Sequence, residues 1–149
     1  MTELQIALKI ALANTFMMKF KAQSYHWNVE GMFFPMFHDF FGDIYNELSS
    51  PVDDIAERIR TIYGYAPISI ADLISASTVV EDVARPVSIQ MMLMGLESCN
   101  QEVVSSLNKA FSLAEQENNQ GLLDVLAGRL DAHAKHAWML RSTLKSIGN

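Results

Sequence analysis

The sequence predicts an all-α fold in which four long helices form one bundle, with a long crossover between the second and third that contains a short helix. Glycine (7 residues) and proline (4 residues) are scarce among 149 residues, a composition that favours helices over many short strands. Apolar residues recur at helical spacing in four long segments. Residues 65–85 carry little of this pattern and supply the crossover. The length indicates a single domain over residues 1–149.

The first helix is expected from Thr2 to about Asn28. Thr2 is placed to cap its start while Gln5 reaches back, and Gly31 follows its end as the C′ residue. Its apolar residues form two stripes, although a surface helix needs only one. The second stripe therefore predicts another packing partner, most simply a second subunit. The stripes are Leu4, Ala7, Leu8, Ala11 and Leu12, and Ile6, Ile10, Ala13, Met17 and Phe20.

The second helix is expected to open at Pro35, because proline suits the first helical turn. Apolar residues at helical spacing continue to near Gly64. Pro51 lies inside this segment and predicts a kink or a restart, which Ser49 and Ser50 are placed to cap.

The crossover is expected to hold a short helix at about 70–76 and to run the length of the bundle. The third helix is expected from near Pro86, and the polar segment 115–121 predicts a turn. The fourth helix follows and is expected to stop at Gly148. Four long helices with one long crossover match the ferritin-like arrangement.

Composition also argues against several partners. The net charge is −6 without a basic tail, which argues against DNA binding through phosphates. Cys99 is the single cysteine, so no intrachain disulfide forms, and a reducing compartment is indicated. Charged residues interrupt the apolar N-terminal stretch, so no membrane span is expected. We therefore expect a cytoplasmic protein with neither a membrane nor a DNA partner.

Two pairs of side chains are candidates for metal binding. His26 ends the first helix and His38 lies near the start of the second, so an antiparallel hairpin would bring both imidazoles to one end. Asp53 and Glu57 lie four apart and share a helix face. The ordinary alternatives are half-buried histidines bonded to backbone carbonyls, and a solvated acidic face balanced by nearby arginines.

Spacing decides how the two pairs would combine. His38 and Asp53 are fifteen residues apart on one helix, which is roughly 22 Å. Two ligands of one ion lie at most roughly 4–5 Å apart. One chain therefore cannot bind an ion with both pairs, whereas two chains packed antiparallel about a two-fold axis can. A di-iron site inside the bundle would need Glu-x-x-His motifs, and the sequence contains none.

At these residues the sequence resembles the Dps family, the mini-ferritins named as DNA-binding proteins from starved cells. The resemblance is carried by "HWNVEG" from His26, by His38 twelve positions on, by "DDIAERI" from Asp53 and by "KHAWMLRS" from Lys135. It covers essentially the whole chain.

The resemblance implies a hollow dodecamer whose two-fold interfaces hold ferroxidase sites. In the family, Fe(II) is oxidised there, commonly by hydrogen peroxide, and ferric mineral collects inside. By matched position, His26 and His38 would bind iron from one subunit, with Asp53 and Glu57 from its neighbour. Trp27 corresponds to the family's tryptophan beside the site.

One position departs from the family pattern. The family has an aspartate four residues after the second histidine, where this chain has Gly42. Asp43 lies about 100° around the helix and would need a local bulge to turn inward, while Glu30 lies four residues after His26. Two functions follow: an iron-oxidising storage cage that protects against oxidative damage, or a non-catalytic, metal-sequestering cage weakened at Gly42.

Overall fold

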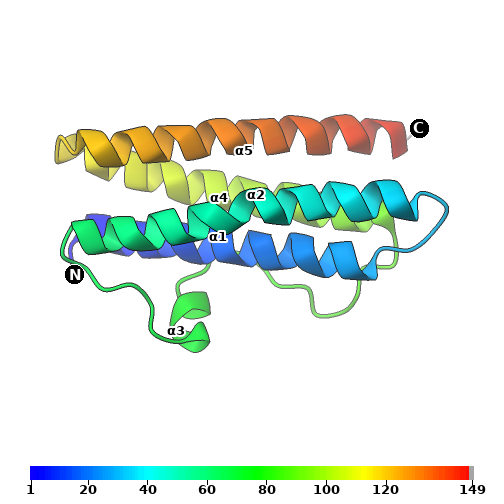
Figure 1. Ribbon diagram of the computed structural model, residues 1–149, viewed down its shortest axis with the longest axis horizontal. Coiled ribbons are helices and arrows are strands. Elements are labelled where there is room, and N and C mark those ends of the chain that lie inside the picture. Colours follow the sequence, from blue (N-terminus) through cyan, green and yellow to red (C-terminus); the bar gives the residue numbers. More distant parts are fainter. Residues whose placement is uncertain (148–149) are drawn as a thin grey trace.

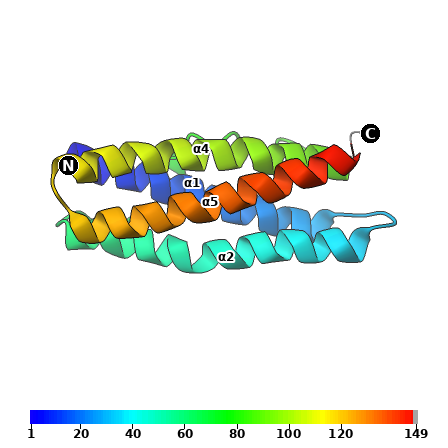
Figure 2. The ribbon, with the colours of Figure 1, turned by 90° about the horizontal axis from the view of Figure 1, so that it is seen from above.

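The computed structural model describes residues 1–147 and has the predicted all-α architecture. Four long helices lie side by side, and the short helix α3 lies outside them against α1 (Figures 1 and 2). The long helices are α1 (Glu3–Asn28), α2 (Phe34–Thr61), α4 (Ile89–Gln116) and α5 (Gln120–Ile147), and α3 spans Ile70–Ser75. The expected helix stop at Gly148 lies outside the described residues.

The start of α1 is fixed by the predicted capping box. The Gln5 amide donates to the Thr2 hydroxyl over 3.1 Å, and the Thr2 amide donates to the Gln5 side chain over 3.0 Å. The Gln5 side chain also donates to the Ile62 carbonyl, which ties the start of α1 to the end of α2. The other end differs from expectation. Val29 is the C-cap, so Gly31, with φ of 120°, serves the turn into α2 instead of the C′ position.

The two apolar stripes of α1 meet different surroundings. The first stripe is buried in the core. The second is divided, because Ala13 and Met17 are buried whereas Ile6 and Phe20 stay 43% and 48% exposed. A second subunit as the partner of this stripe stays a prediction, since one chain does not test it.

Helix α2 passes through Pro51 without a break, so the restart expected there is wrong. A proline inside a helix removes one backbone hydrogen bond and costs about 3 kcal/mol. Here the proline ring is buried, and Leu48 and Ile55 on either side are almost wholly inaccessible to solvent. Burial of each such side chain contributes about 1.5–3 kcal/mol. Packing therefore outweighs the cost of the proline, and α2 is one continuous helix.

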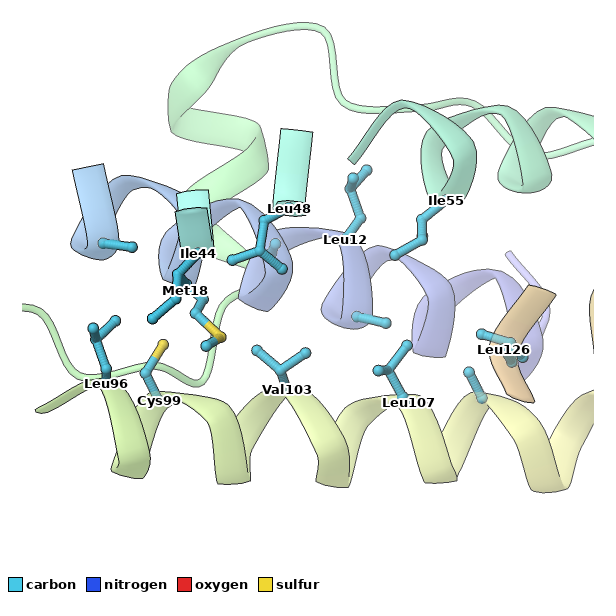
Figure 3. Packing of buried hydrophobic residues seen from close by; sticks show 14 of the residues in the cluster. Leu12, Met18, Ile44, Leu48, Ile55, Leu96, Cys99, Val103, Leu107 and Leu126 are labelled. Atoms are coloured by element: carbon cyan, nitrogen blue, oxygen red, sulfur yellow. The ribbon is translucent and has the colours of Figure 1, made fainter. Parts of the chain in front are cut away.

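The interior is a close-packed layer of side chains from α1, α2 and α4, with Leu126 of α5 joining it (Figure 3). Cys99 points into this layer and is 3% exposed. Burial raises the pKa of its thiol to about 12, so the thiol is unreactive at neutral pH.

The crossover is attached to α1 by buried polar groups. Asn14, which is wholly buried, accepts from the Thr78 amide and donates to the Thr78 hydroxyl, both over 2.9 Å. Lys21 forms a 3.3 Å ion pair with Asp82 farther along. Helix α4 then begins at Ile89 with Ser88 as its cap, a little later than the expected Pro86. The crossover therefore lies against α1 along much of its length.

A buried polar network joins α2, α4 and α5 near the middle of the bundle. Arg129 forms a bidentate ion pair with Glu47 at 2.7 and 2.9 Å, and His136 donates to Glu47 over 2.6 Å. His133 is wholly buried; its Nδ1 lies 2.7 Å from the Asn100 side-chain oxygen and its Nε2 lies 3.2 Å from the Arg129 guanidinium. Spacing alone places the two histidines on a polar helix edge, whereas the structure buries both.

The network holds its members in defined charge states. Burial opposes ionisation of Glu47, but hydrogen bonds from His136 and Arg129 outweigh it and hold the Glu47 pKa well below its usual 4.5. Burial, followed by the positive charge of Arg129, lowers the pKa of His133 from 6.5 to about 3. His133 is therefore neutral in the native state across the whole range from neutral pH to pH 4.

Acid is therefore expected to destabilise the fold. Between pH 6.5 and pH 3 the unfolded chain protonates at His133 and the native chain does not, so stability falls by up to about 1.4 kcal/mol per pH unit. The ionised form of Glu47 stabilises the fold above pH 4.5, and this contribution is lost as the pH falls further. Calorimetry at one protein concentration from pH 7 to pH 4 measures the midpoint. Between pH 7 and pH 4 the unfolding midpoint of the His133→Gln variant should fall less than that of wild type. Equal falls would contradict the conclusion that His133 is held neutral in the native state.

Candidate metal centre

His26 and His38 come together at the end of the hairpin where the turn connects α1 to α2. His26 lies in the last turn of α1 and His38 near the first turn of α2, with a short turn at 29–33 between the helices. Their rings stack with centroids 3.8 Å apart and planes inclined by 16°. The antiparallel hairpin thus produces the convergence that the sequence predicts.

Each histidine is held by the other's backbone. The Nδ1 atom of His26 lies 2.6 Å from the His38 carbonyl oxygen, and the Nδ1 atom of His38 lies 2.7 Å from the His26 carbonyl oxygen. A carbonyl oxygen only accepts, so both Nδ1 atoms carry a proton and donate it. Each Nε2 then keeps a lone pair. The structure therefore contains the hydrogen bonds to backbone carbonyls that were the alternative explanation of the two histidines. The same bonds also fix the Nδ1–H tautomer, in which Nε2 is able to bind a metal.

Neighbouring rings enclose the pair. The Phe34 ring stacks on His38 at 5.0 Å, and the Tyr45 ring meets His26 edge-on at 5.3 Å. Trp27 lies on the outer side of α1, where it is 59% exposed and packs edge-on against Phe20. Both histidines are half-buried. The imidazoles are thus pre-positioned and still reachable from outside the chain.

Asp53 and Glu57 lie one turn apart on α2, and both are exposed. Within residues 1–147, neither forms a hydrogen bond or a salt bridge, and the Arg60 guanidinium instead lies over the Tyr65 ring at 4.3 Å. The side chains of Val52 and Ala56 line an apolar hollow of about 390 Å³ between α2, α1 and the α3 segment. Asp53 and Glu57 thus each follow directly, in the sequence, a residue that lines this hollow, and neither carboxylate is paired with a cation in the described chain.

The two pairs stay apart within one chain. Because α2 is continuous from Phe34 to Thr61, fifteen helical residues separate His38 from Asp53 by roughly 22 Å. In the part of the chain that the structure describes, no three histidine, cysteine or acidic side chains converge closely enough to hold an ion. A site that uses both pairs needs a second chain.

The other two candidate carboxylates do not contact the histidines. Asp43 is exposed, and α2 is regular α-helix around it, so the bulge that would turn it inward is absent. Glu30 lies beyond the end of α1 and pairs with Arg85 at 3.2 Å. Position 42 is a buried glycine whose backbone lies directly against the His26 ring.

Comparison with known proteins identifies the family. The model of the Ferritin-like domain matches residues 6–148. A low-temperature-induced protein of Nostoc is 30% identical over 90% of this chain and 75% of its own. DNA protection during starvation protein 2 of Bacillus anthracis is 28% identical over 83% of this chain and 84% of its own. The Dps crystal structure from Vibrio cholerae superposes with a TM-score of 0.90, at 25% identity over 95% and 89% of the two chains.

The chain belongs to the Dps family of ferritin-like proteins. The resemblance that rests on "HWNVEG", His38 and "DDIAERI" is thereby confirmed. The Vibrio cholerae structure is described as a member of a broad superfamily of ferritin-like diiron-carboxylate proteins. No helix within residues 1–147 is both long enough and apolar enough to cross a membrane.

Tyr25 is a supporting residue that sequence reasoning missed. It precedes His26, is 1% exposed, and donates its hydroxyl proton to Asp82 over 2.6 Å. Burial, followed by that hydrogen bond, raises the Tyr25 pKa far above its usual range. On α4, a Cβ at Gly95 would lie 2.7 Å from the hydroxyl. In the sequence, the glycine inside the helical pattern of α4 was the one signal of this close approach. The contacts of Tyr25 with Asp82 and Gly95 hold the last turns of α1 between the crossover and α4 in this member of the Dps family.

Removing the Tyr25 hydroxyl tests this clamp. Tyr25→Phe should lower the free energy of unfolding by about 1–2 kcal/mol, because it removes one buried hydrogen bond to a charged group. Chemical denaturation at fixed protein concentration measures the loss. Tyr45→Phe is the matched control, since the Tyr45 hydroxyl has no hydrogen bond within residues 1–147 and should change little. Equal effects of the two variants would exclude the Tyr25–Asp82 bond as the clamp.

Proposed function

We propose that this chain is a mini-ferritin subunit that oxidises Fe(II) at sites shared by two-fold related subunits and stores ferric iron inside a hollow shell. The shell is expected to be a dodecamer in the cytoplasm. The observation that carries the proposal is the stacked His26–His38 pair, whose two Nδ1–H bonds leave both Nε2 lone pairs for a metal.

The second half of the site would come from Asp53 and Glu57 of another subunit. These carboxylates lack a cation within the described chain, and each follows in the sequence a residue, Val52 or Ala56, that lines the apolar hollow. A second subunit packed there would cover apolar surface, including the exposed Ile6 and Phe20 of α1. Two imidazoles and two carboxylates form a donor set that suits iron, and the hard oxygens favour Fe(III) as it forms.

Iron is the substrate in this proposal. Two Fe(II) ions give one electron each to one hydrogen peroxide molecule, whose O–O bond breaks. With two protons the oxygen atoms leave as two water molecules, and two Fe(III) ions remain for storage. The histidines and carboxylates hold Fe(II) and stabilise the charge gained on oxidation. Consuming iron together with peroxide would protect the cell from oxidative damage.

Gly42 favours a second candidate function. The family places an aspartate at this position, and within residues 1–147 no carboxylate forms a hydrogen bond or an ion pair with His26 or His38. A site with one anionic ligand fewer would bind iron less tightly. The chain would then form a non-catalytic cage that sequesters metal. DNA binding is not part of either proposal, because the net charge of −6 opposes it.

Ferroxidase activity separates the two functions. Fe(II) is added without oxygen, peroxide follows, and ferric absorbance is recorded. The proposal expects wild type to be at least tenfold faster than Asp53→Ala/Glu57→Ala, because carboxylate ligands carry much of the transition-state stabilisation. Asp54→Ala, which removes the neighbouring exposed carboxylate, should match wild type. A wild type no faster than the double variant would leave the metal-sequestering cage as the function.

Mixed shells test whether the site is shared between subunits. His26→Ala/His38→Ala and Asp53→Ala/Glu57→Ala should each be inactive alone. Random co-assembly in equal amounts should restore about a quarter of wild-type activity, since half of the two-fold pairs are mixed and each mixed pair has one complete site. Activity is measured after the two variants are unfolded and refolded together, with separately refolded shells as the control. No recovery would contradict a site that is shared between subunits.

A further inference from the structure

We infer that Gly42 is a positioning residue of the metal site: its missing side chain provides the space in which the His26 ring stacks on His38. This inference rests on the proposed function for the role of the pair, and on the geometry of one chain for the space itself. It reverses the simplest interpretation of the sequence, in which Gly42 is only a lost carboxylate.

The space at position 42 is already filled by the imidazole. A Cβ built on Gly42 would lie 3.0 Å from Nδ1 of His26 and 3.2 Å from its Cε1. Ordinary van der Waals contacts of a Cβ begin at about 3.4 Å. A Cβ at position 42 therefore requires the His26 ring to shift by a few tenths of an ångström.

Neighbouring groups restrict where the ring can move. Its stacking partner His38 lies 3.8 Å away, and Phe34 lies against His38 in turn. The Tyr45 ring meets His26 from another direction at 5.3 Å. The atom nearest the new Cβ is Nδ1, which holds the 2.6 Å hydrogen bond to the His38 carbonyl. A side chain at 42 would therefore break or lengthen that bond or separate the stacked rings.

Loss of that bond would affect the metal rather than the fold. The Nδ1–H donation keeps the lone pair on Nε2 and fixes the ring orientation, and removing such supporting bonds typically costs 10–100-fold in metal affinity. The helix itself gains, because alanine is about 1 kcal/mol more favourable than glycine inside a helix. Gly42→Ala should thus bind metal more weakly while its stability stays the same or rises. A misfolded variant would instead lose both stability and metal binding.

The test uses Co(II), added without oxygen to the assembled protein and followed by its visible absorption. Gly42→Ala is expected to bind Co(II) 10–100-fold more weakly than wild type, with an unfolding midpoint no lower. Gly128→Ala is the matched control, because a Cβ there meets nothing within 4 Å and should leave affinity unchanged. Gly42→Asp should also bind more weakly than wild type, because its Cβ occupies the same space.

Two results would overturn the inference: Gly42→Ala binding Co(II) as tightly as wild type, or Gly42→Asp binding it more tightly, which would make the carboxylate the missing element. Crystal structures of metal-free wild type and Gly42→Ala give an independent readout. A displaced His26 ring in the variant supports the inference, and superposed rings overturn it. If the ring moves but wild type neither binds Co(II) nor oxidises iron, the proposed function fails and the spatial role of Gly42 remains.

Discussion

The separation of His38 from Asp53 along α2 is the constraint on which the proposed metal chemistry depends. An uninterrupted α-helix is stiff, and Pro51 does not break it because its surroundings are buried. The histidines and the carboxylates are thus held roughly 22 Å apart. Each pair lies separately on the chain, and a metal site that used both pairs would need two associated chains. Under the proposed function, assembly of the shell and completion of the metal site would be the same event.

Each half of the site is supported by contacts from elsewhere in the fold. Gln5 ties the start of α1 to the end of α2, and Tyr25 fastens the last turns of α1 to Asp82 of the crossover. These contacts fix the hairpin at both ends, so the imidazoles of His26 and His38 meet with little freedom to rearrange. Ligands held in this way lose little conformational entropy when a metal binds.

The interior of the bundle pairs most of its buried polar side-chain atoms with one another, and among the described residues only Arg129 Nε is buried without a partner. Glu47, His133 and His136 would be plausible metal ligands by residue type, yet Arg129 supplies the positive charge that they need, and Asn100 accounts for the remaining imidazole nitrogen of His133. A carboxylate that already accepts hydrogen bonds from a guanidinium and an imidazole is not free to bind a metal ion. The candidate metal ligands are therefore the two pairs outside this network, the half-buried His26 with His38 and the exposed Asp53 with Glu57.

The sequence by itself determined the helices, the crossover and the separation of the two ligand pairs, because capping, apolar periodicity and rise per residue are local properties. The restart expected at Pro51 and the polar helix edge that spacing assigns to His133 and His136 are wrong, because both outcomes depend on burial. Only the tertiary structure decided that the two imidazoles stack, that each bonds the other's carbonyl, and that Gly42 leaves them room. Those features arise where separate helices meet, and spacing along one chain does not encode how two helix surfaces fit together.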